Sequence, residues 1–320
     1  MTSFSGTYVE AVRQALFDAM EADPRVCCLG EDIGAYGGAF RATEGLQERF
    51  GPDRVIDTPI AEQAIAGAAI GAALMGQRPV AEFQFMDFAL LASDLMVNFA
   101  AKAHWRWGAS VPAVFRGPAG GGNGGGPFHS QNPEGHFLGS PGLKVVAPGT
   151  VRDAYALLRA AIEDPDPVLV FEHKHLYRRL KDQWDEAPTA RLGEAALRKD
   201  GASACIITYG AAQHVALEAA TGLDVAVLDL RTLWPLDDEA IASLARRTHR
   251  VLVLTEASRT YGPGAELAAR IGETSFPWLD APILRVGAAD TPTPASPPLE
   301  AAYLPSAAHV KSELERLLAW

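Results

Sequence analysis

The chain has 320 residues, of which 48% are hydrophobic and 21% are charged, a composition typical of a globular protein with room for two domains. No apolar run approaches the ~20 residues that cross a bilayer, and the formal net charge of −11 argues against a nucleic-acid-binding surface. The first residues show neither a signal-peptide nor a transit-peptide pattern, so we expect a cytoplasmic protein. Cys27, Cys28 and Cys205 lie in apolar runs without paired spacing, which predicts reduced core residues rather than disulfides or a zinc site.

Short apolar runs that suit buried parallel strands alternate along the chain with stretches of helical period. The expected strands cover residues 26–30, 54–57, 78–83, 111–116, 143–148, 168–172, 204–210, 225–230, 251–256 and 283–287. The expected helices cover residues 7–23, 61–76, 88–105, 151–164 and 237–249. This alternation predicts α/β architecture with doubly wound sheets.

A change of composition divides the pattern into two parts. Residues 177–200 are polar and show no clear strand, so we expect an N-terminal domain over 1–185, a linker over 186–200 and a C-terminal domain over 201–320. The proline-rich segment 291–298 predicts an extended surface loop.

A glycine-rich loop follows the strand expected at 111–116. Six of the seven residues from Gly120 to Gly126 are glycine, and the segment leads to His129. A phosphate-binding P-loop requires a lysine after the glycines and then a helix, whereas Pro127 and Phe128 follow here. The pattern therefore favours a loop whose backbone passes close to another group and delivers His129 at its end.

Glu62 enters an otherwise apolar helix and is chemically conspicuous for that reason. A carboxylate in an apolar interface costs several kcal/mol unless a partner pairs with it. A structural role at the helix start is also open because the helix dipole favours an acid there. The capping-box position after Thr58 is occupied by Ala61, one residue earlier. From the residues alone, functional and structural roles of Glu62 are equally open.

Many sequence blocks together carry a resemblance to one known family. They lie between about Thr7 and Leu318 and include GEDIGAYGGAF, RVIDTPIAEQAIAG, RPVAEFQFMDF, VFRGPAG, HSQNPE, DPDPVLVFEHKHLYR and DLRTLWPLD. Taken in order, they resemble the beta subunit of 2-oxo acid dehydrogenase decarboxylases. These are the thiamine-diphosphate components of the pyruvate, branched-chain 2-oxo acid and acetoin dehydrogenase complexes. The resemblance implies a transketolase-like pyrimidine-binding domain followed by a transketolase-like C-terminal domain.

The resemblance also implies roles for individual residues. Glu62 falls on the glutamate that hydrogen-bonds the aminopyrimidine ring of thiamine diphosphate and favours the imino tautomer, which activates the thiazolium carbon. Phe88, Gln84 and Ile60 fall on positions that line the cofactor. His129 falls on the active-site histidine, which is expected to orient substrate or transfer a proton during acyl transfer, a task that suits a near-neutral imidazole.

Metal and partner expectations follow from the same resemblance. A structural potassium ion is expected at Ala113, Ala161, Ile162, Asp164 and Asp166, mostly through backbone carbonyls. The thiamine pyrophosphate-and-magnesium motif, which opens with Gly-Asp-Gly, does not occur in the sequence. The resemblance therefore implies that an alpha subunit binds the magnesium and the other half of the cofactor, in an α2β2 heterotetramer with an active site between chains.

The favoured function is that of a beta subunit in the oxidative decarboxylation of a branched-chain 2-oxo acid or pyruvate, with acylation of a lipoyl domain of the complex's acyltransferase core. An acetoin dehydrogenase beta subunit and a non-catalytic α/β assembly subunit stay open as alternatives. We also expect the glycine-rich loop to be partly mobile before partner and cofactor bind.

Overall fold

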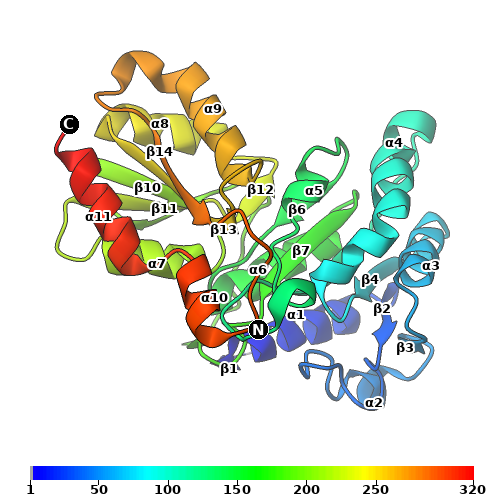
Figure 1. The fold of residues 1–320 in the computed structure, drawn as a ribbon. Helices are drawn as coiled ribbons and strands as arrows, with labels where there is room; N and C mark the ends of the chain where they lie inside the picture. The colour runs from blue at the N-terminus through cyan, green and yellow to red at the C-terminus, as the bar shows by residue number, and fades with distance from the viewer. Residues whose placement is uncertain (1–2) are drawn as a thin grey trace. The chain divides into compact units, whose positions relative to one another are not determined.

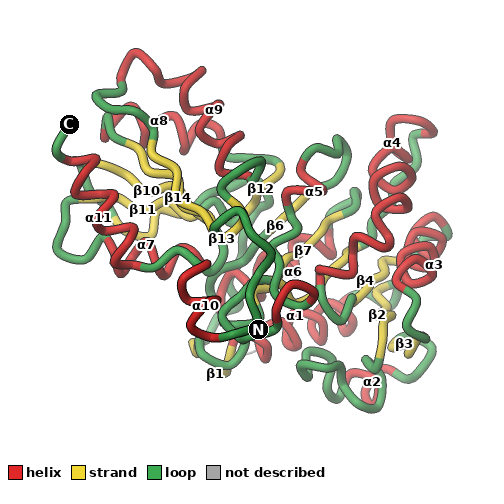
Figure 2. Tube along the Cα trace, in the orientation of Figure 1, coloured by secondary structure: helices red, strands yellow, loops and turns green. Residues whose placement is uncertain are grey.

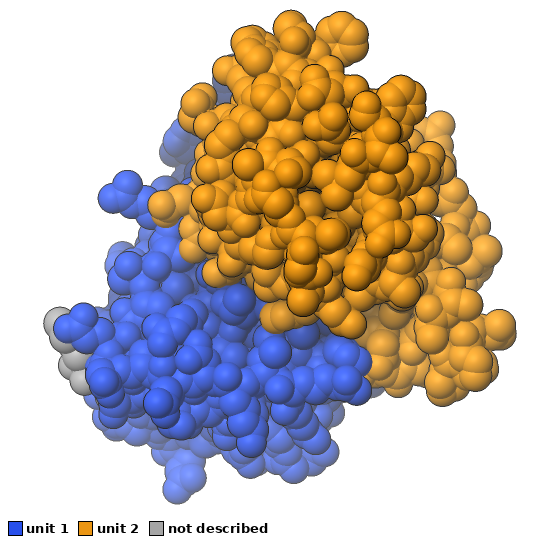
Figure 3. Space-filling model, turned by 90° about the vertical axis from the view of Figure 1, so that its left-hand side faces the viewer, with its two compact units in different colours: residues 1–119, 136–192 blue, residues 120–135, 193–320 orange. Residues whose placement is uncertain are grey.

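The computed structural model describes residues 3–320, which belong to two compact units. Unit 1 comprises Met1–Ala119 and His136–Leu192, and unit 2 comprises Gly120–Gly135 and Gly193–Trp320 (Figure 3). The division after Leu192 falls inside the segment 186–200 that the sequence predicts as a linker. The glycine-rich loop belongs to unit 2, although both neighbouring stretches of chain belong to unit 1.

Unit 1 is built on a parallel sheet whose strands lie in the order β6-β7-β5-β4-β2-β3 (Figure 1). The strands are β2 (Val26–Glu31), β3 (Val55–Thr58), β4 (Arg78–Glu82), β5 (Val114–Ala119), β6 (Lys144–Val146) and β7 (Val168–His173). Every residue of β5 and β7 is buried, as expected for strands covered on both faces. A small antiparallel pair, β1 (Phe4–Thr7) and β8 (Lys181–Trp184), lies outside this sheet.

The helices of unit 1 pack on this sheet and on each other (Figure 2). They are α1 (Tyr8–Ala22), α2 (Leu46–Phe50), α3 (Glu62–Leu74), α4 (Ala101–Trp107) and α6 (Val151–Glu163), with the short α5 (Gly135–Leu138) at the boundary of the units. A capping box starts α1, because the Glu10 carboxylate accepts a hydrogen bond from the Thr7 amide at 2.6 Å. Helix α1 packs against α6, and α3 packs against β4.

The helix expected over residues 88–105 is not one regular helix. The structure has a 3-10 segment (Met86–Ala92), a π-helical segment (Leu95–Ala100) and only then α4. Apolar residues of this stretch are found both exposed and buried, as Leu91 and Met96 show. The apolar pattern therefore indicated a helical segment correctly but could not define its hydrogen-bonding type.

Unit 2 contains a second sheet with the strand order β14-β13-β10-β11-β9. The elements are β9 (Ala196–Lys199), β10 (Ala204–Thr208), α7 (Ala212–Ala219), β11 (Val225–Asp229), β12 (Thr232–Trp234), α8 (Asp238–Thr248), β13 (Val251–Ser258), α9 (Pro263–Ser275), β14 (Leu284–Ala288), α10 (Pro297–Tyr303) and α11 (Ala307–Leu318). Strand β9 is antiparallel to β11, and the other pairs are parallel. Helices α7 and α11 lie on one face of the sheet, and α8 and α9 lie on the other (Figure 1).

The structure confirms the doubly wound fold class and corrects several local expectations. Strands β8 and β9 form in the polar segment 177–200, where we expected none. Both are short and only half-buried, so the sequence shows no apolar run at either of them. Helix α10 begins at Pro297, inside the segment expected to be an extended loop. Helices α7, α9 and α11 were not predicted at all. The three cysteines are free, as predicted, although Cys27 is only partly buried.

Among residues 3–320, no helix combines the length and the apolar character that a membrane-spanning segment needs.

Candidate active site

The carboxyl ends of β4, β2 and β3 bring several sequence-predicted residues to one edge of the unit 1 sheet. These strands are neighbours and parallel, with Glu31 at the end of β2 paired in register with Thr58 at the end of β3. Ligands of open α/β sheets bind at this edge. Glu62 follows β3 as the first residue of α3, and its side chain is buried. It therefore lies where unpaired helix amides stabilise a carboxylate.

Glu31 is a candidate site residue that the sequence analysis did not single out. It is buried, and its Oε1 atom has no hydrogen-bond partner. Burial raises the pKa of the Glu31 carboxyl, and the negative charge of Glu62 raises it further. The two carboxyls are thus close enough to repel each other when both are ionised. The available signal was an acid that closes an otherwise apolar strand, VCCLGE.

Aromatic side chains lie after β4. Phe88 contacts Phe85 edge-to-face with ring centroids 5.9 Å apart, and Phe85 contacts Phe40 in the same manner at 5.6 Å. Phe88 and Gln84 are partly exposed, whereas Ile60 is 80% exposed. An isoleucine so exposed beside a buried acid suits a surface that a ligand or another chain covers.

A buried ion network holds the strand ends beneath this edge. Arg116 of β5 donates to both Glu82 of β4 and Glu172 of β7, with a distance of 2.7 Å between its Nη2 and Glu172 Oε2. The Tyr177 hydroxyl donates to the same Glu172 oxygen at 2.7 Å. Burial raises the pKa of Glu82, although Arg116 opposes this rise. The network adds side-chain bonds across three parallel strands that also pair through their backbones.

His129 lies in unit 2, at the end of a 3-10 turn formed by Gly126–Phe128. Its backbone amide donates to Gly126 O at 3.3 Å, and its side chain is partly exposed. Unit 1 thus brings Glu62, Gln84, Phe88 and Ile60 to one edge, and unit 2 carries His129.

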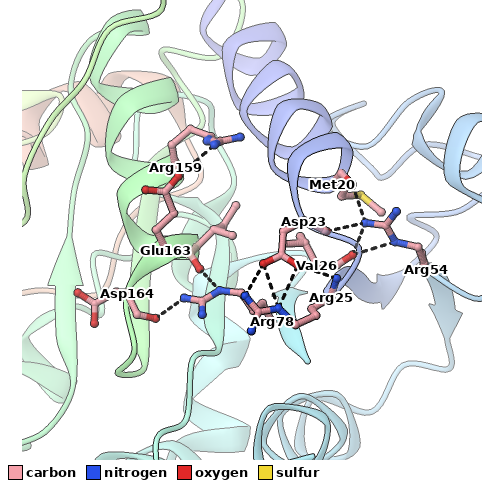
Figure 4. A network of polar contacts seen from close by, with 10 residues as sticks. Met20, Asp23, Arg25, Val26, Arg54, Arg78, Arg159, Glu163 and Asp164 are labelled. Atoms are coloured by element: carbon pink, nitrogen blue, oxygen red, sulfur yellow. Dashed lines mark hydrogen bonds and ion pairs between the residues drawn. The ribbon is translucent and has the colours of Figure 1, made fainter. Parts of the chain in front are cut away.

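The oxygens expected to bind potassium already accept hydrogen bonds from the chain, of which Figure 4 shows the one from Arg78 to Asp164. Arg78 donates to Ile162 O and to Asp164 O, each at 2.8 Å, and Lys144 contacts the carboxylates of Asp164 at 2.7 Å and of Asp166 at 3.1 Å. The Ala113 and Ala161 carbonyls accept from the Val168 and Asp164 amides. Arg78 and Lys144 thus already supply positive charge to the oxygens of Ile162, Asp164 and Asp166, and the potassium site stays a prediction.

No cluster of three or more histidine, cysteine, aspartate or glutamate side chains within residues 3–320 could hold a metal ion.

Two transketolase domain families match successive parts of the chain. Residues 5–179 match the transketolase pyrimidine-binding domain, and residues 193–310 match the transketolase C-terminal domain. The fold is similar to that of a solved split-gene transketolase described as an inactive beta4 tetramer, with a TM-score of 0.80 at 22% identity, over 98% of this chain and 99% of that one.

Full-length relatives narrow this class. The chain is 44% identical to the 2-oxoisovalerate dehydrogenase subunit beta of Bacillus subtilis (strain 168), over 97% of this chain and 98% of that protein. It is 40% identical to the chloroplastic pyruvate dehydrogenase E1 component subunit beta-4 of Oryza sativa subsp. japonica, over 96% of this chain and 79% of that protein. The chain belongs to the family of 2-oxo acid dehydrogenase beta subunits, a family of oxidoreductases, which confirms the resemblance seen in the sequence.

Proposed function

We propose that this chain, together with an alpha subunit, oxidatively decarboxylates a 2-oxo acid and acylates a lipoyl group, with thiamine diphosphate as cofactor. In this reaction the substrate loses its carboxylate as carbon dioxide, and its acyl group forms a thioester with one sulfur of the lipoyl disulfide. The other sulfur takes up the electron pair of the broken bond and a proton. The balance therefore needs no further oxidant.

The observation that carries the proposal is the pair of buried carboxyls, Glu31 and Glu62, at the carboxyl edge of the unit 1 sheet. Glu31 Oε1 lacks a donor, and the charges of the two groups disfavour each other. A bound ring with N–H donors relieves both costs, because it supplies hydrogen bonds to buried acceptors. The residues present thus fit the aminopyrimidine half of thiamine diphosphate.

Four residues would hold this half of the cofactor: Glu62 through a hydrogen bond, and Ile60, Gln84 and Phe88 by lining the ring. When bound, thiamine diphosphate supplies the carbanion-stabilising centre that allows a 2-oxo acid to lose carbon dioxide. The Glu62 carboxyl would hold a proton between its own oxygen and a ring nitrogen, and surrounding apolar side chains would exclude water. His129 would donate a proton from an imidazole nitrogen to the leaving lipoyl sulfur.

An exposed apolar surface on unit 1 supports the need for a partner chain. One face of α3 presents Ala64, Ala68, Gly71 and Leu74 to solvent, all small or apolar. On α4, Trp105 is 93% exposed. Apolar helix faces of this kind mark protein interfaces. We assign the partner as the alpha subunit in an α2β2 heterotetramer, which would bind the magnesium and pyrophosphate that this sequence lacks a motif for.

The substrate is proposed to be a branched-chain 2-oxo acid, with pyruvate as the second candidate. The support is the 44% identity to a subunit named for 2-oxoisovalerate, against 40% to one named for pyruvate. If the reconstituted tetramer turned over acetoin and neither acid, acetoin would become the proposed substrate in place of both acids. The three free cysteines suit the reducing cytoplasm, where we place the protein.

Glu62→Gln tests the proposal. In the tetramer reconstituted with the alpha subunit, decarboxylation of 2-oxoisovalerate with an artificial electron acceptor should fall by about 10²-fold or more. The reason is that an amide cannot exchange a proton with the ring nitrogen as the Glu62 carboxyl would. Calorimetric titration with thiamine diphosphate should show weaker binding. The exposed Glu48→Gln in the same unit is the matched control and should change neither. Unaltered turnover by Glu62→Gln, or full turnover by this chain alone, would contradict the proposal.

His129→Asn tests the second half of the reaction. Acylation of a free lipoyl domain should fall by roughly 10- to 100-fold because the sulfur loses its proton donor, while decarboxylation with the artificial acceptor falls less. The control is His309→Asn, at an exposed position on α11. Equal acylation by His129→Asn and wild type would remove the proposed role of His129.

A further inference from the structure

The glycine-rich loop, defined here as Gly120–Gly135, has an unusual alternating backbone. Gly120, Gly122, Gly124 and Gly126 have φ of 82°, 83°, 70° and 68°, in the left-handed region that favours glycine. Gly125 between two of them has φ −72° and ψ −14°. Alternation of right- and left-handed residues turns successive amides toward one side and forms a concave anion-binding nest. Left-handed glycines at every second position, with the Gly122 and Gly124 amides turned toward one carboxylate, give the loop the geometry of an anion site, here called the glycine nest, although its sequence is not that of a P-loop.

The anion in this nest is a side chain of the same unit. Glu300 of α10 accepts from the Gly122 amide through Oε1 and from the Gly124 amide through Oε2, both at 2.9 Å. Its carboxylate is buried, with the residue 4% exposed. A carboxylate that accepts two backbone amides in a buried setting makes charge-assisted hydrogen bonds, which are stronger than neutral ones.

Two further contacts extend the attachment along the loop. Glu256 of β13 accepts from the Gly121 amide at 2.7 Å and from the Asn132 side chain at 3.1 Å. Near the loop's end, the Tyr209 hydroxyl donates to Glu134 at 2.6 Å. Each acceptor or donor comes from the unit 2 scaffold, so the loop is held on both sides of His129.

Close packing explains why the loop consists of glycines at these positions. A Cβ atom at Gly121 would lie 3.1 Å from Leu304 Cδ1, and one at Gly126 would lie 3.1 Å from Ala295 Cβ. Both neighbours flank Glu300 in the sequence. The backbone of the loop therefore lies directly against the segment that carries the carboxylate, so close that a side chain would require Leu304 or Ala295 to shift by a few tenths of an ångström.

We propose that Glu300 is a positioning residue, which fills the glycine nest and so fixes the loop conformation that presents His129. This inference rests on the proposed function in assigning the acyl-transfer step to His129. An amide in place of the carboxylate offers one acceptor oxygen and presents an NH2 group to the second glycine amide. Loss of the carboxylate would leave both glycine amides without this acceptor and release the loop from α10.

The first test uses Glu300→Ala and Glu300→Gln in the reconstituted tetramer with thiamine diphosphate. Lipoyl-domain acylation should fall by about 10-fold or more in Glu300→Ala, further than decarboxylation with an artificial acceptor, because loop position matters most to His129. Formate or acetate at tens of millimolar, roughly the concentration that a weak two-bond anion site requires, should restore part of the acylation to Glu300→Ala. The exposed Glu273→Gln on α9 should change nothing. Equal loss of both reactions without anion rescue would overturn the positioning role in favour of a general structural one.

A second readout does not depend on catalysis, so it separates this inference from the proposed function. Amide hydrogen exchange of the loop peptide, followed by mass spectrometry, should be about 10-fold faster or more in Glu300→Ala than in wild type or Glu273→Gln. If His129→Asn acylates normally but exchange still responds to Glu300→Ala, the proposed role of His129 is wrong, whereas the proposal that Glu300 holds the loop is supported. Unchanged exchange in Glu300→Ala would contradict the proposal that Glu300 holds the loop, whatever the result for His129→Asn.

Glycine variants provide a matched comparison of backbone strain. Gly124→Ala requires an L residue at φ +70° with its Cβ 3.3 Å from Ala295 O, whereas Gly222→Ala requires φ +76° with no atom within 4 Å. Both carry the cost of a left-handed backbone, but only Gly124 lies in the nest. Acylation should fall severalfold in Gly124→Ala alone. Equal acylation by the two variants would contradict a requirement for the nest.

Discussion

Carboxylates organise both units, but the groups that bind them differ. In unit 1, Glu82 and Glu172 share the buried guanidinium of Arg116. In unit 2, Glu300 binds the neutral backbone amides of Gly122 and Gly124. The first arrangement concentrates two charge partners on one side chain, whereas the second distributes the donors along the main chain. Substitution of the single residue Arg116 should therefore destabilise the sheet edge strongly, whereas loss of any one loop hydrogen bond should have a smaller effect.

Arg116→Met should produce the largest effect on stability. It leaves two buried carboxylates facing each other without a cation, which should lower the free energy of unfolding by roughly 3–5 kcal/mol. Urea unfolding of the purified protein at pH 7.5 measures this. The matched control is Arg159→Met, which breaks only a surface i,i+4 pair with Glu163 and should change stability by less than about 0.5 kcal/mol. A loss as small as that of the control would show that the network contributes little.

Tyr209→Phe should have an intermediate effect, in unit 2. It removes the hydroxyl that donates to buried Glu134 at 2.6 Å. Burial, and to a lesser extent the charge of Glu134, raises the pKa of Tyr209, so this donor stays protonated. The expected loss is about 1–2 kcal/mol, measured by the same unfolding experiment. Tyr261→Phe, at a residue 97% exposed, is the control. A loss as large as that of Arg116→Met would break the contrast between the two units.

Glu31→Gln should have the smallest effect and the opposite sign. Because the folded pKa of Glu31 is raised, the folded state binds its proton more tightly than the unfolded state, whose pKa is near 4.5. Stability attributable to this group is thus fully present below pH 4.5 and is lost as pH rises through the folded pKa. The cofactor-free Glu31→Gln protein should be more stable than wild type near neutral pH, because the amide carries no charge that burial and Glu62 disfavour.

The pH dependence of this difference provides the check. The advantage of Glu31→Gln should shrink as pH falls toward 4.5, the ordinary pKa of a glutamate. Glu48→Gln, at an exposed position, should show no such trend. Destabilisation by Glu31→Gln at neutral pH would mean that the ionised carboxylate is satisfied in the folded protein.

Local sequence signals predicted the parallel strands and the helix that begins at Glu62, because apolar runs and period are properties of neighbouring residues. They did not predict α10, although Ser296 followed by Pro297 is a recognisable helix start. The proline-rich composition was interpreted instead as an extended loop. At this segment the position of one serine and one proline determines the structure more than the number of prolines does.

The partners of the candidate site residues could not be predicted in the same way. Gly122 and Glu300 are 178 positions apart, and Arg116 and Glu172 are 56 apart. Such pairs are brought together by strand order and chain crossover, which no local pattern encodes. The sequence indicated that the glycines approach something closely but not that a carboxylate of the same unit lies there. The expected mobility of the loop stays a prediction, which its hydrogen bonds to Glu256 and Glu300 disfavour.

The membership of Gly120–Gly135 in unit 2 has a consequence for dissection of the protein. A fragment starting at Gly193 would retain the sheet and α10 but would lack the loop, and so would leave the Glu300 carboxylate without the Gly122 and Gly124 amides. Such a fragment should therefore be less stable than one that carries the loop. An autonomous second domain therefore has to be assembled from two separate stretches of sequence, for example by grafting residues 120–135 onto its amino end through a flexible linker.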